Sequence, residues 1–296
     1  MPRLTAIVPA TDSPPTLSAC LTGIESAHEP PEELIVVREG GAPSSARNAG
    51  AQDASGDVLV FVDADVVPHT DAFARIRRAF DDDAGLTALF GSYDDSPAAP
   101  GTVSVFRNLL HHHVHQSSAG LATTFWTGLG AVRRDAFVAV GGFNPEQRWL
   151  EDVDLGMRLS AGGARIVLDP TVQGTHLKHW SLGEMVRTDF ARRGLPWVDL
   201  MLRHRGASTE LNLAWRHRAS AAASVLAAIG VLRRRPRLAV VGIAALVALN
   251  APFYMFLLRR RGPLEATLGV LLHAVHHVTG ALAAAAGVVA YLRRRR

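Results

Sequence analysis

Cysteine is nearly absent from this sequence, since Cys20 is the single one among 296 residues. One thiol cannot supply a disulfide framework, a cysteine-rich zinc site or a paired redox motif, so these three classes are excluded. Charged residues make up 20% of the chain and hydrophobic residues 48%, a balance that excludes a disordered or collagen-like protein. We also find no repeat of fixed period, and residues 1–10 are too short an apolar segment to predict a secretory signal.

Acidic side chains are almost missing from the last third of the chain. Residues 1–210 contain 18 Lys and Arg against 26 Asp and Glu, whereas residues 211–296 contain 13 against 1. The arginines of this tail interrupt apolar runs, which is typical of membrane-flanking residues rather than of a nucleic-acid-binding surface. We therefore expect an acidic domain over 1–210, a basic membrane-associated region over 211–296, and no nucleic-acid partner.

Three uncharged stretches make up most of the tail. They cover 219–232, 238–258 and 266–292, which are 14, 21 and 27 residues long. A helix needs about 20 apolar residues to cross a bilayer, so the second and third are long enough and the first is not. A buried hairpin of a soluble protein would normally keep a polar stripe, which these stretches lack. The sequence predicts a membrane anchor in which the second and third stretches form a two-span hairpin, with re-entrant hairpins as the alternative.

Short apolar runs in the front part alternate with segments of helical spacing. Residues 4–9, 34–37 and 58–62 are continuous apolar runs of strand length, and helical patterns separate them. Strands that are apolar on both faces and joined by helices form a parallel sheet between two helical layers. The front part is therefore predicted to be an α/β domain with a mixed, mainly parallel sheet.

Two carboxylates follow the third of these runs directly. Asp63 and Asp65 stand two residues apart, at the carboxyl end of the predicted strand, where ligands gather in open α/β sheets. Carboxylates this close repel each other unless a cation lies between them, and hard divalent ions prefer oxygen ligands. Mg²⁺ or Mn²⁺ held there would neutralise a leaving diphosphate. The pattern alone is weak, because acidic residues are common in turns after strands.

A second acidic group opens a predicted helix. The apolar spacing of Leu150, Val153 and Met157 places Glu151 and Asp152 near the N-terminus of that helix. Acidic residues at this position can simply complement the helix dipole. They can also act as a general base, because a carboxylate that the dipole keeps ionised accepts a proton from a sugar or lipid hydroxyl.

Together these motifs resemble the family 2 glycosyltransferases. The runs that carry the resemblance are 46–50, 54–57, 61–65, 128–134, 141–143, 151–155 and 170–176. Their order and spacing match over roughly residues 3–200. The resemblance implies a GT-A fold with C-terminal apolar helices added to it, a nucleotide-sugar donor, a divalent metal and inversion at the anomeric carbon.

The resemblance also implies roles for individual residues. Asp63 and Asp65 match the motif that holds the metal and the diphosphate, with Asp65 as the more direct ligand. Asp152 matches the catalytic base, and Glu151 is its nearest rival. His176 matches a late histidine near the metal or the diphosphate, so we count it among the candidate metal ligands.

The nucleotide is expected to lie against three further residues. Arg47 matches an arginine near the nucleotide base, and Pro9 closes the first strand beside it. The family commonly has an aspartate just after the second strand, whereas this sequence has Glu39 there, with a longer arm. Glu39 is therefore the candidate contact to the base, and the resemblance does not specify which base is bound.

The function that we expect is a membrane-anchored inverting glycosyltransferase acting on a hydroxyl of a lipid or a cell-envelope glycan. Nucleotide sugars are made in the cytoplasm, so the catalytic domain is expected on the cytoplasmic side. A sugar-nucleotide pyrophosphorylase would need a glycine-rich loop after the first strand, and residues 9–13 contain no glycine. A non-catalytic membrane protein that retains the GT-A fold is the alternative.

Three further motifs have more than one interpretation. The histidines of 111–115 suit a metal, an acceptor-side contact or simple packing. His273, His276 and His277 share one face of the last apolar stretch, where inter-helix hydrogen bonds are more plausible than a cofactor. The run 192–197 is interpreted as a possible wall of an acceptor channel.

Overall fold

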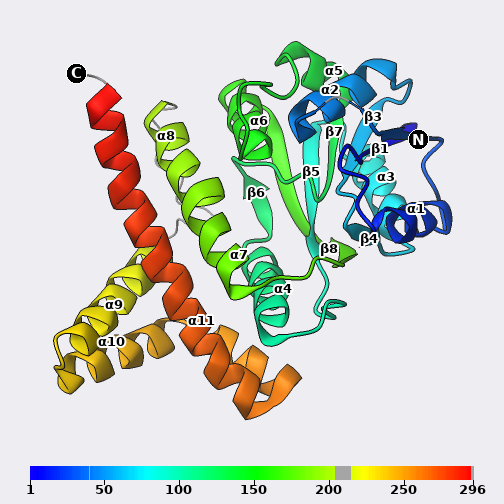
Figure 1. Ribbon diagram of the computed structural model, residues 1–296. Coiled ribbons are helices and arrows are strands. Elements are labelled where there is room, and N and C mark those ends of the chain that lie inside the picture. Colours follow the sequence, from blue (N-terminus) through cyan, green and yellow to red (C-terminus); the bar gives the residue numbers. More distant parts are fainter. Residues whose placement is uncertain (40, 204–214, 295–296) are drawn as a thin grey trace. The chain divides into compact units, whose positions relative to one another are not determined.

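The computed structural model describes residues 1–39, 41–203 and 215–294, and the chain divides into two compact units. The sheet unit comprises Met1–Ala99 and Val114–Lys178, and the helical unit comprises Pro100–His113 and His179–Arg296 (Figure 1). This division differs from the predicted boundary at residue 210. The segment 102–113 groups with the apolar tail because Phe106 packs against Phe253 and His112 against Phe256. The segment after the last strand groups with it because it lies against the last helix of the tail.

The sheet unit contains an eight-stranded mixed sheet in the order β2-β1-β3-β7-β5-β8-β4, with β6 paired to β8. β1 is parallel to β2 and β3, and β5 is parallel to β8. β7 is antiparallel to both β3 and β5, while β4 and β6 are antiparallel to β8. The sheet is therefore mixed as predicted, with less parallel pairing than the apolar runs indicated. The strands are β1 (Leu4–Pro9), β2 (Glu33–Val37), β3 (Val58–Val62), β4 (Val66–Pro68), β5 (Leu86–Tyr93), β6 (Gly120–Ala122), β7 (Leu129–Arg133) and β8 (Arg165–His176).

Helices pack on this sheet through small and apolar side chains. All five residues of β3 are buried, and a core of aliphatic and aromatic side chains lies between the central strands and their helices. Gly50 lets one helix approach β1 closely, because a Cβ there would lie 2.6 Å from a methyl of Ile7. The helices of this unit are α1 (Leu17–Glu25), α2 (Pro43–Asp53), α3 (Ala72–Asp82), α5 (Arg134–Ala139) and α6 (Glu151–Ala161).

The helical unit begins with α4 (Thr102–Gln116), whose last turn belongs to the sheet unit. A π-helix, η1, lies between two short α-helices, and α9 packs against α10 and α11. The remaining elements are α7 (Leu182–Arg187), η1 (Thr188–Gly194), α8 (Leu195–Arg203), α9 (Trp215–Leu232), α10 (Pro236–Leu249) and α11 (Ala251–Arg294).

The apolar stretches do not all form the helices that were predicted. The stretch 238–258 is divided, because α10 ends at Leu249 and Asn250 turns its side chain to bond Ser220 on α9 at 2.8 Å. The prediction of one spanning helix over 238–258 is therefore wrong. The stretch 266–292 lies within α11, which has a non-helical residue at Gly262. Among the described residues, one helix is long and apolar enough to cross a membrane, and it covers Ala251–Arg293.

Candidate active site

The carboxyl end of β3 carries the first acidic pair. The backbone turns sharply there, since the amide of Val66 donates to the carbonyl of Asp63 at 2.9 Å. The amide of Asp63 donates to Gly128 at 3.2 Å, and the carbonyl of Asp65 accepts from Leu177 at 2.8 Å. Backbone bonds to the segments before β7 and after β8 thus fix both acidic residues at the edge of the sheet.

Arg47 lies between carboxylates that are distant in the sequence. Its Nη2 is 2.7 Å from Oδ1 of Asp63, and its Nη1 is 2.8 Å from Oε1 of Glu151. The residue is only 4% exposed, and α2 holds it there. Burial alone would lower the pKa of Arg47, but the charges of Asp63 and Glu151 raise it. The guanidinium therefore joins the end of β3 to the start of α6, and the predicted contact with a nucleotide base stays a prediction.

Asp152 stands in the first turn of α6, beside the segment that leads into β7. Its Oδ1 accepts from the amide of Val153 at 2.8 Å, and its Oδ2 lies 3.4 Å from the amide of Thr127. Gly156 permits this approach, because a Cβ at that position would collide with the backbone of residues 124–125. Leu150, just before the helix, has φ 62°, a conformation that costs free energy in a non-glycine residue.

The electrostatic environment of Asp152 differs from that of an ordinary surface carboxylate. Burial, followed by the negative charge of Glu151, raises the pKa of Asp152 from 3.8 to about 7, while Arg47 opposes the shift. A carboxyl group with a pKa near the working pH is suited to accept a proton and release it again. Glu151 is occupied by Arg47, which makes Asp152 the better placed of the two predicted candidates.

Asp65 and His176 form a second pair at this edge. Nε2 of His176 lies 3.6 Å from Oδ2 of Asp65, and the imidazole stacks on Tyr93 with ring centroids 4.1 Å apart. Burial tends to raise the pKa of Asp65, but His176 and then Lys178 lower it. The carboxylate of Asp65 is thus ionised and lies next to the imidazole of His176. Both a carboxylate oxygen and an imidazole nitrogen can ligate a divalent ion.

The predicted metal ligands are therefore not all equivalent. Asp65 and His176 are adjacent, whereas Asp63 directs Oδ1 to Arg47. In the described part of the chain, no group of three or more histidine, cysteine or acidic side chains has the geometry of a metal site. These residues fit a metal only as a partial set, which a ligand with its own oxygens would have to complete.

The residues expected beside the nucleotide lie at the same edge of the sheet. Pro9 pairs with Val37 across β1 and β2, so the loop that contains Glu39 follows directly. Glu39 is exposed to solvent. Pro9 and Glu39 thus lie at the ends of neighbouring strands, and their predicted contacts with the nucleotide stay predictions.

Sequence reasoning missed the aromatic residues behind the acidic edge. Tyr93 contacts both His176 and Trp126, with the Trp126 ring edge-on at a centroid distance of 4.9 Å. His115 packs edge-on against Trp126, and its Nδ1 lies 2.9 Å from the carbonyl of Gly91. A tyrosine that ends a strand carries no local signal for this role, since its partners come from elements far along the chain.

The other histidines of 111–115 do not join His115. In the helical unit, His112 stacks on Phe256 and His113 lies against Phe253. The run is therefore divided between two environments, and the metal interpretation gains no support among the described residues.

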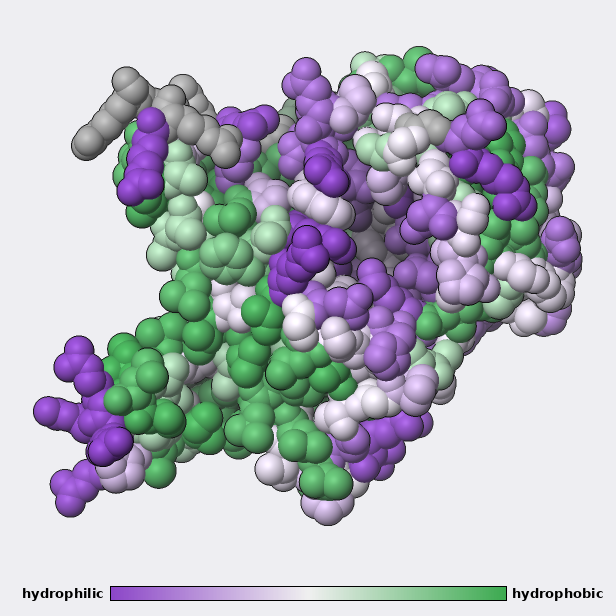
Figure 2. All heavy atoms as spheres, in the orientation of Figure 1, coloured by the Kyte–Doolittle hydropathy of each residue, from purple (hydrophilic) through white to green (hydrophobic). Residues whose placement is uncertain are grey.

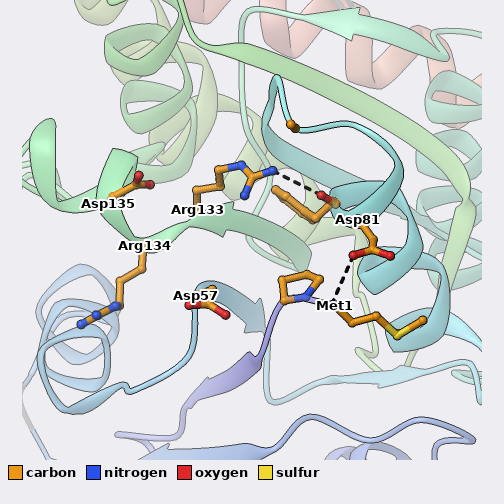
Figure 3. A pocket seen from close by; sticks show the side chains of 9 residues that line it. Met1, Asp57, Asp81, Arg133, Arg134 and Asp135 are labelled. Carbon is orange, nitrogen blue, oxygen red and sulfur yellow. Dashed lines mark hydrogen bonds and ion pairs between the residues drawn. The ribbon is translucent and has the colours of Figure 1, made fainter.

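A cavity of about 490 Å³ lies in the sheet unit, and neither Asp63 nor Asp65 nor Asp152 lines it. Figure 3 shows Met1, Asp57, Asp81, Arg133 and Arg134 around it. Asp57 precedes β3 and Arg133 ends the antiparallel β7, so this cavity is at the opposite end of the sheet from Asp63. The arginines that line it hydrogen-bond to backbone carbonyls of the same unit. Arg133 donates to the carbonyl of Leu86 at 2.7 Å, and Arg134 donates to that of Ala54 at 3.4 Å.

Comparison with known proteins supports the GT-A class of fold. The chain resembles the mannosyltransferase PcManGT from Pyrobaculum calidifontis, solved with GDP-Man and Mn²⁺, with 17% identity and a TM-score of 0.54 over 96% of this chain and 87% of that one. TarS from S. aureus aligns with 13% identity and a TM-score of 0.45 over 94% of this chain and 55% of that one. GalNAc-T7 with UDP, GalNAc and Mn²⁺ aligns with 12% identity and a TM-score of 0.48 over 75% and 51%.

The family model named Glycosyl transferase family 2 matches residues 33–140. A search of curated proteins gives no match. The matched residues run from β2 to the end of α5 and include Arg47, Asp63 and Asp65. This part of the chain thus matches the family 2 glycosyltransferase model, and the chain has a GT-A type fold, as the sequence predicted.

Proposed function

We propose that the protein is a membrane-associated inverting glycosyltransferase, which moves a sugar from a nucleotide-sugar donor to a hydroxyl of a lipid or cell-envelope glycan. The observation that carries this proposal is the position of Asp152. Its carboxyl group stands beside the acidic edge of the sheet, with a pKa raised to about 7 by burial and by Glu151. The family 2 match and the fold support a donor of the nucleotide-sugar class.

Asp152 acts as the general base in this proposal. Its carboxylate takes the proton of the acceptor hydroxyl while the acceptor oxygen forms a bond to the anomeric carbon. The bond between that carbon and the diphosphate oxygen breaks at the same time, and the nucleoside diphosphate leaves with the electron pair. Attack from the face opposite the leaving group inverts the anomeric configuration.

Asp65 and His176 would hold a divalent ion, Mg²⁺ or Mn²⁺, together with oxygens of the donor diphosphate. Such an ion supplies positive charge where the leaving diphosphate becomes more negative. Asp63 is tied to Arg47 at 2.7 Å, so its role is to hold the end of β3 against α6. Pro9 and Glu39 would contact the nucleoside.

The helical unit would place the domain at a membrane. It contains the long apolar helix α11, and the sheet unit with its acidic site would face the cytoplasm, where nucleotide sugars are made. A lipid-linked or membrane-bound acceptor would then meet the donor at that face.

The test measures donor binding and transfer separately. Purified full-length protein is screened against nucleotide sugars by thermal shift, with Mn²⁺ or with EDTA, because a bound ligand raises the melting temperature by mass action. The stabilising donor is then mixed with a membrane lipid extract, and release of nucleoside diphosphate is followed. We expect release that needs both the divalent ion and the extract. Donor binding without release under every condition would favour the non-catalytic alternative.

A further inference from the structure

The helical unit exposes a broad apolar surface on three helices, here called the apolar face. Figure 2 shows this face as a continuous hydrophobic area over α9, α10 and α11. Soluble monomers rarely expose apolar patches larger than a few hundred Å². The large side chains that form it, each more than a third exposed, are Ile229, Val231, Leu232, Val240, Val241, Val247, Met255, Leu258, Leu264 and Leu271.

Arginines border the apolar face, and acidic side chains are nearly missing around it. Residues 233–235 form the turn between α9 and α10, and Arg237 lies in the first turn of α10. Residues 259–261 precede the break in α11, and all of these arginines are exposed. Glu265 is the one acidic residue in 211–296, and its Oε1 is 3.0 Å from Oγ1 of Thr102. An apolar face with a cationic border fits a bilayer whose headgroups are anionic.

The hairpin of α9 and α10 is too short to cross a bilayer. α10 has 14 residues, which span about 21 Å at 1.5 Å per residue, against a hydrocarbon thickness of about 30 Å. A perpendicular insertion would therefore leave the arginines of the turn inside the hydrocarbon, where charged side chains are unfavourable. A hairpin that lies along the interface keeps them among the headgroups.

One side of the second half of α11 is covered by polar elements of its own unit, whereas Leu282, Val288, Val289 and Leu292 on the same half are exposed. Nδ1 of His276 lies 2.7 Å from Oδ2 of Asp189 on η1, and Arg107 of α4 lies 3.0 Å from Oδ1 of the same carboxylate. A Cβ on Gly287 would lie 2.9 Å from Val198 on α8, so the two helices are in close contact there. η1 and α8 also carry Arg192, Arg193, Asp199 and Arg203.

This covering argues against a spanning role for α11. Burial would raise the pKa of Asp189, but His276, Arg107 and Arg193 lower it to about 2, so the carboxylate is ionised. Ionised groups packed along residues 276–287 would be drawn into the hydrocarbon if this helix crossed the bilayer. Exposed large apolar side chains occur on α11 from Met255 to Leu292, and the helix is interrupted at Gly262.

We propose that the helical unit is monotopic: α9, α10 and the first part of α11 lie in the interface of one leaflet of an anionic bilayer, and none of these helices crosses it. The proposal rests on the membrane association in the proposed function and replaces the two-span hairpin expected from the sequence. Two measurements test it. The first tests whether the helical unit binds an anionic bilayer at all, and the second tests whether any of its helices crosses the bilayer.

The first measurement is flotation of the full-length protein with preformed vesicles. We expect binding to phosphatidylcholine vesicles with 30% phosphatidylglycerol to exceed binding to pure phosphatidylcholine by at least about tenfold, and to fall at high salt. The variant Arg233→Gln/Arg234→Gln/Arg235→Gln should lose most of this preference. The matched variant Arg3→Gln/Arg75→Gln/Arg78→Gln, which removes three charges from the sheet unit, should keep it.

No binding to either vesicle would overturn both the proposal and membrane association, and a stable dimer with the apolar face cross-linked to a second copy would do the same.

The second measurement is cysteine labelling in cells that produce the protein. Cysteines are placed singly at Arg234 and Arg260, and the native Cys20 is fully buried and serves as the silent background. An impermeant maleimide should label neither position in intact cells and both in inverted membrane vesicles. Labelling of either position from outside would show that the chain crosses, which overturns the monotopic arrangement and leaves the glycosyltransferase proposal standing.

Discussion

Both units bury an arginine against a carboxylate, yet the two clusters have opposite effects on the carboxyl groups within them. In the sheet unit, Arg47 is shared between Asp63 and Glu151, and a third carboxyl group, Asp152, is nearby. In the helical unit, Arg107 and His276 converge on the single carboxylate of Asp189. The first cluster has more carboxyl groups than guanidinium groups, whereas in the second the guanidinium groups of Arg107 and Arg193 and the imidazole of His276 all act on one carboxylate.

This imbalance separates a candidate site of chemistry from a structural contact. With too few cations, the pKa of Asp152 rises to about 7 through burial and the charge of Glu151, and the group can exchange a proton. Burial acts on Asp189 in the same direction, but His276 and Arg107 hold its pKa at about 2, and the group stays ionised. Burial alone therefore does not indicate a functional carboxylate; the charges that surround it decide.

The largest expected effect is on transfer. Asp152→Asn should keep donor binding and lower turnover by roughly 10²–10⁴-fold, because a positioned base contributes about that much. Turnover is measured as release of nucleoside diphosphate, and donor binding as a thermal shift. Asp135→Asn, an exposed carboxylate change in the same unit, is the control and should leave turnover unchanged. Undiminished turnover of Asp152→Asn would move the base to another residue.

The next effect is on stability in the helical unit. Asp189→Asn leaves Arg107 buried without its counter-charge, so the free energy of unfolding should fall by about 3–5 kcal/mol, measured by denaturant titration. Asp199→Asn is the control, because its pair with Arg203 is partly exposed, with side chains 29% and 56% accessible, and should cost less than about 1 kcal/mol.

The stability contributed by Asp189 is also expected to depend on pH. The pKa of Asp189 is below its ordinary value of 3.8, so its stabilising contribution is present above about pH 4 and is lost as the pH falls toward 2. The wild type should lose stability in this window, and Asp189→Asn should lose less. Equal acid sensitivity in both proteins would contradict the ionised state of Asp189.

A smaller contrast is expected between the two carboxylates after β3. Reasoning from the sequence treats Asp63 and Asp65 as mutually repelling, so that removal of either leaves the ligand-free fold intact. The structure changes this expectation for Asp63, because its carboxylate is the partner of the buried Arg47. Asp65→Ala should remove Mn²⁺-dependent donor binding without a change in the ligand-free melting temperature. Asp63→Ala should instead lower the free energy of unfolding by about 1–3 kcal/mol, and thermal scans with Mn²⁺ or EDTA separate the two outcomes.

Local patterns in the sequence predict part of this arrangement. The apolar runs predict β1, β2 and β3, and the acidic pairs after β3 and at the start of α6 follow from residues close in the chain. The bridge through Arg47 joins residues 16 and 104 positions apart, and no local pattern contains it.

The helical unit shows the same limit. The hydropathy pattern predicts one apolar helix over 238–258. In the structure α10 ends at Leu249, and the side chain of Asn250 donates a hydrogen bond to Ser220 on α9. A hydropathy profile averages over one polar residue and does not register its partner 30 positions away.

The smallest effect concerns the charge that tunes the base. Glu151→Gln removes the negative charge that, after burial, most raises the pKa of Asp152, so that pKa should fall below about 7. Proton acceptance needs the ionised form, so kcat/KM of the wild type should rise with pH through about 7, and that of Glu151→Gln should rise at a lower pH. At pH 7 about half of the wild-type base is ionised, so the variant can gain at most about twofold there, and more in acid. The measurement is the pH profile of kcat/KM from pH 5 to 9, with the exposed Glu146→Gln as the control that should keep the wild-type profile. If Glu151→Gln also keeps that profile, Glu151 does not tune the base, and the acidic excess around Arg47 is as structural as the cluster around Asp189.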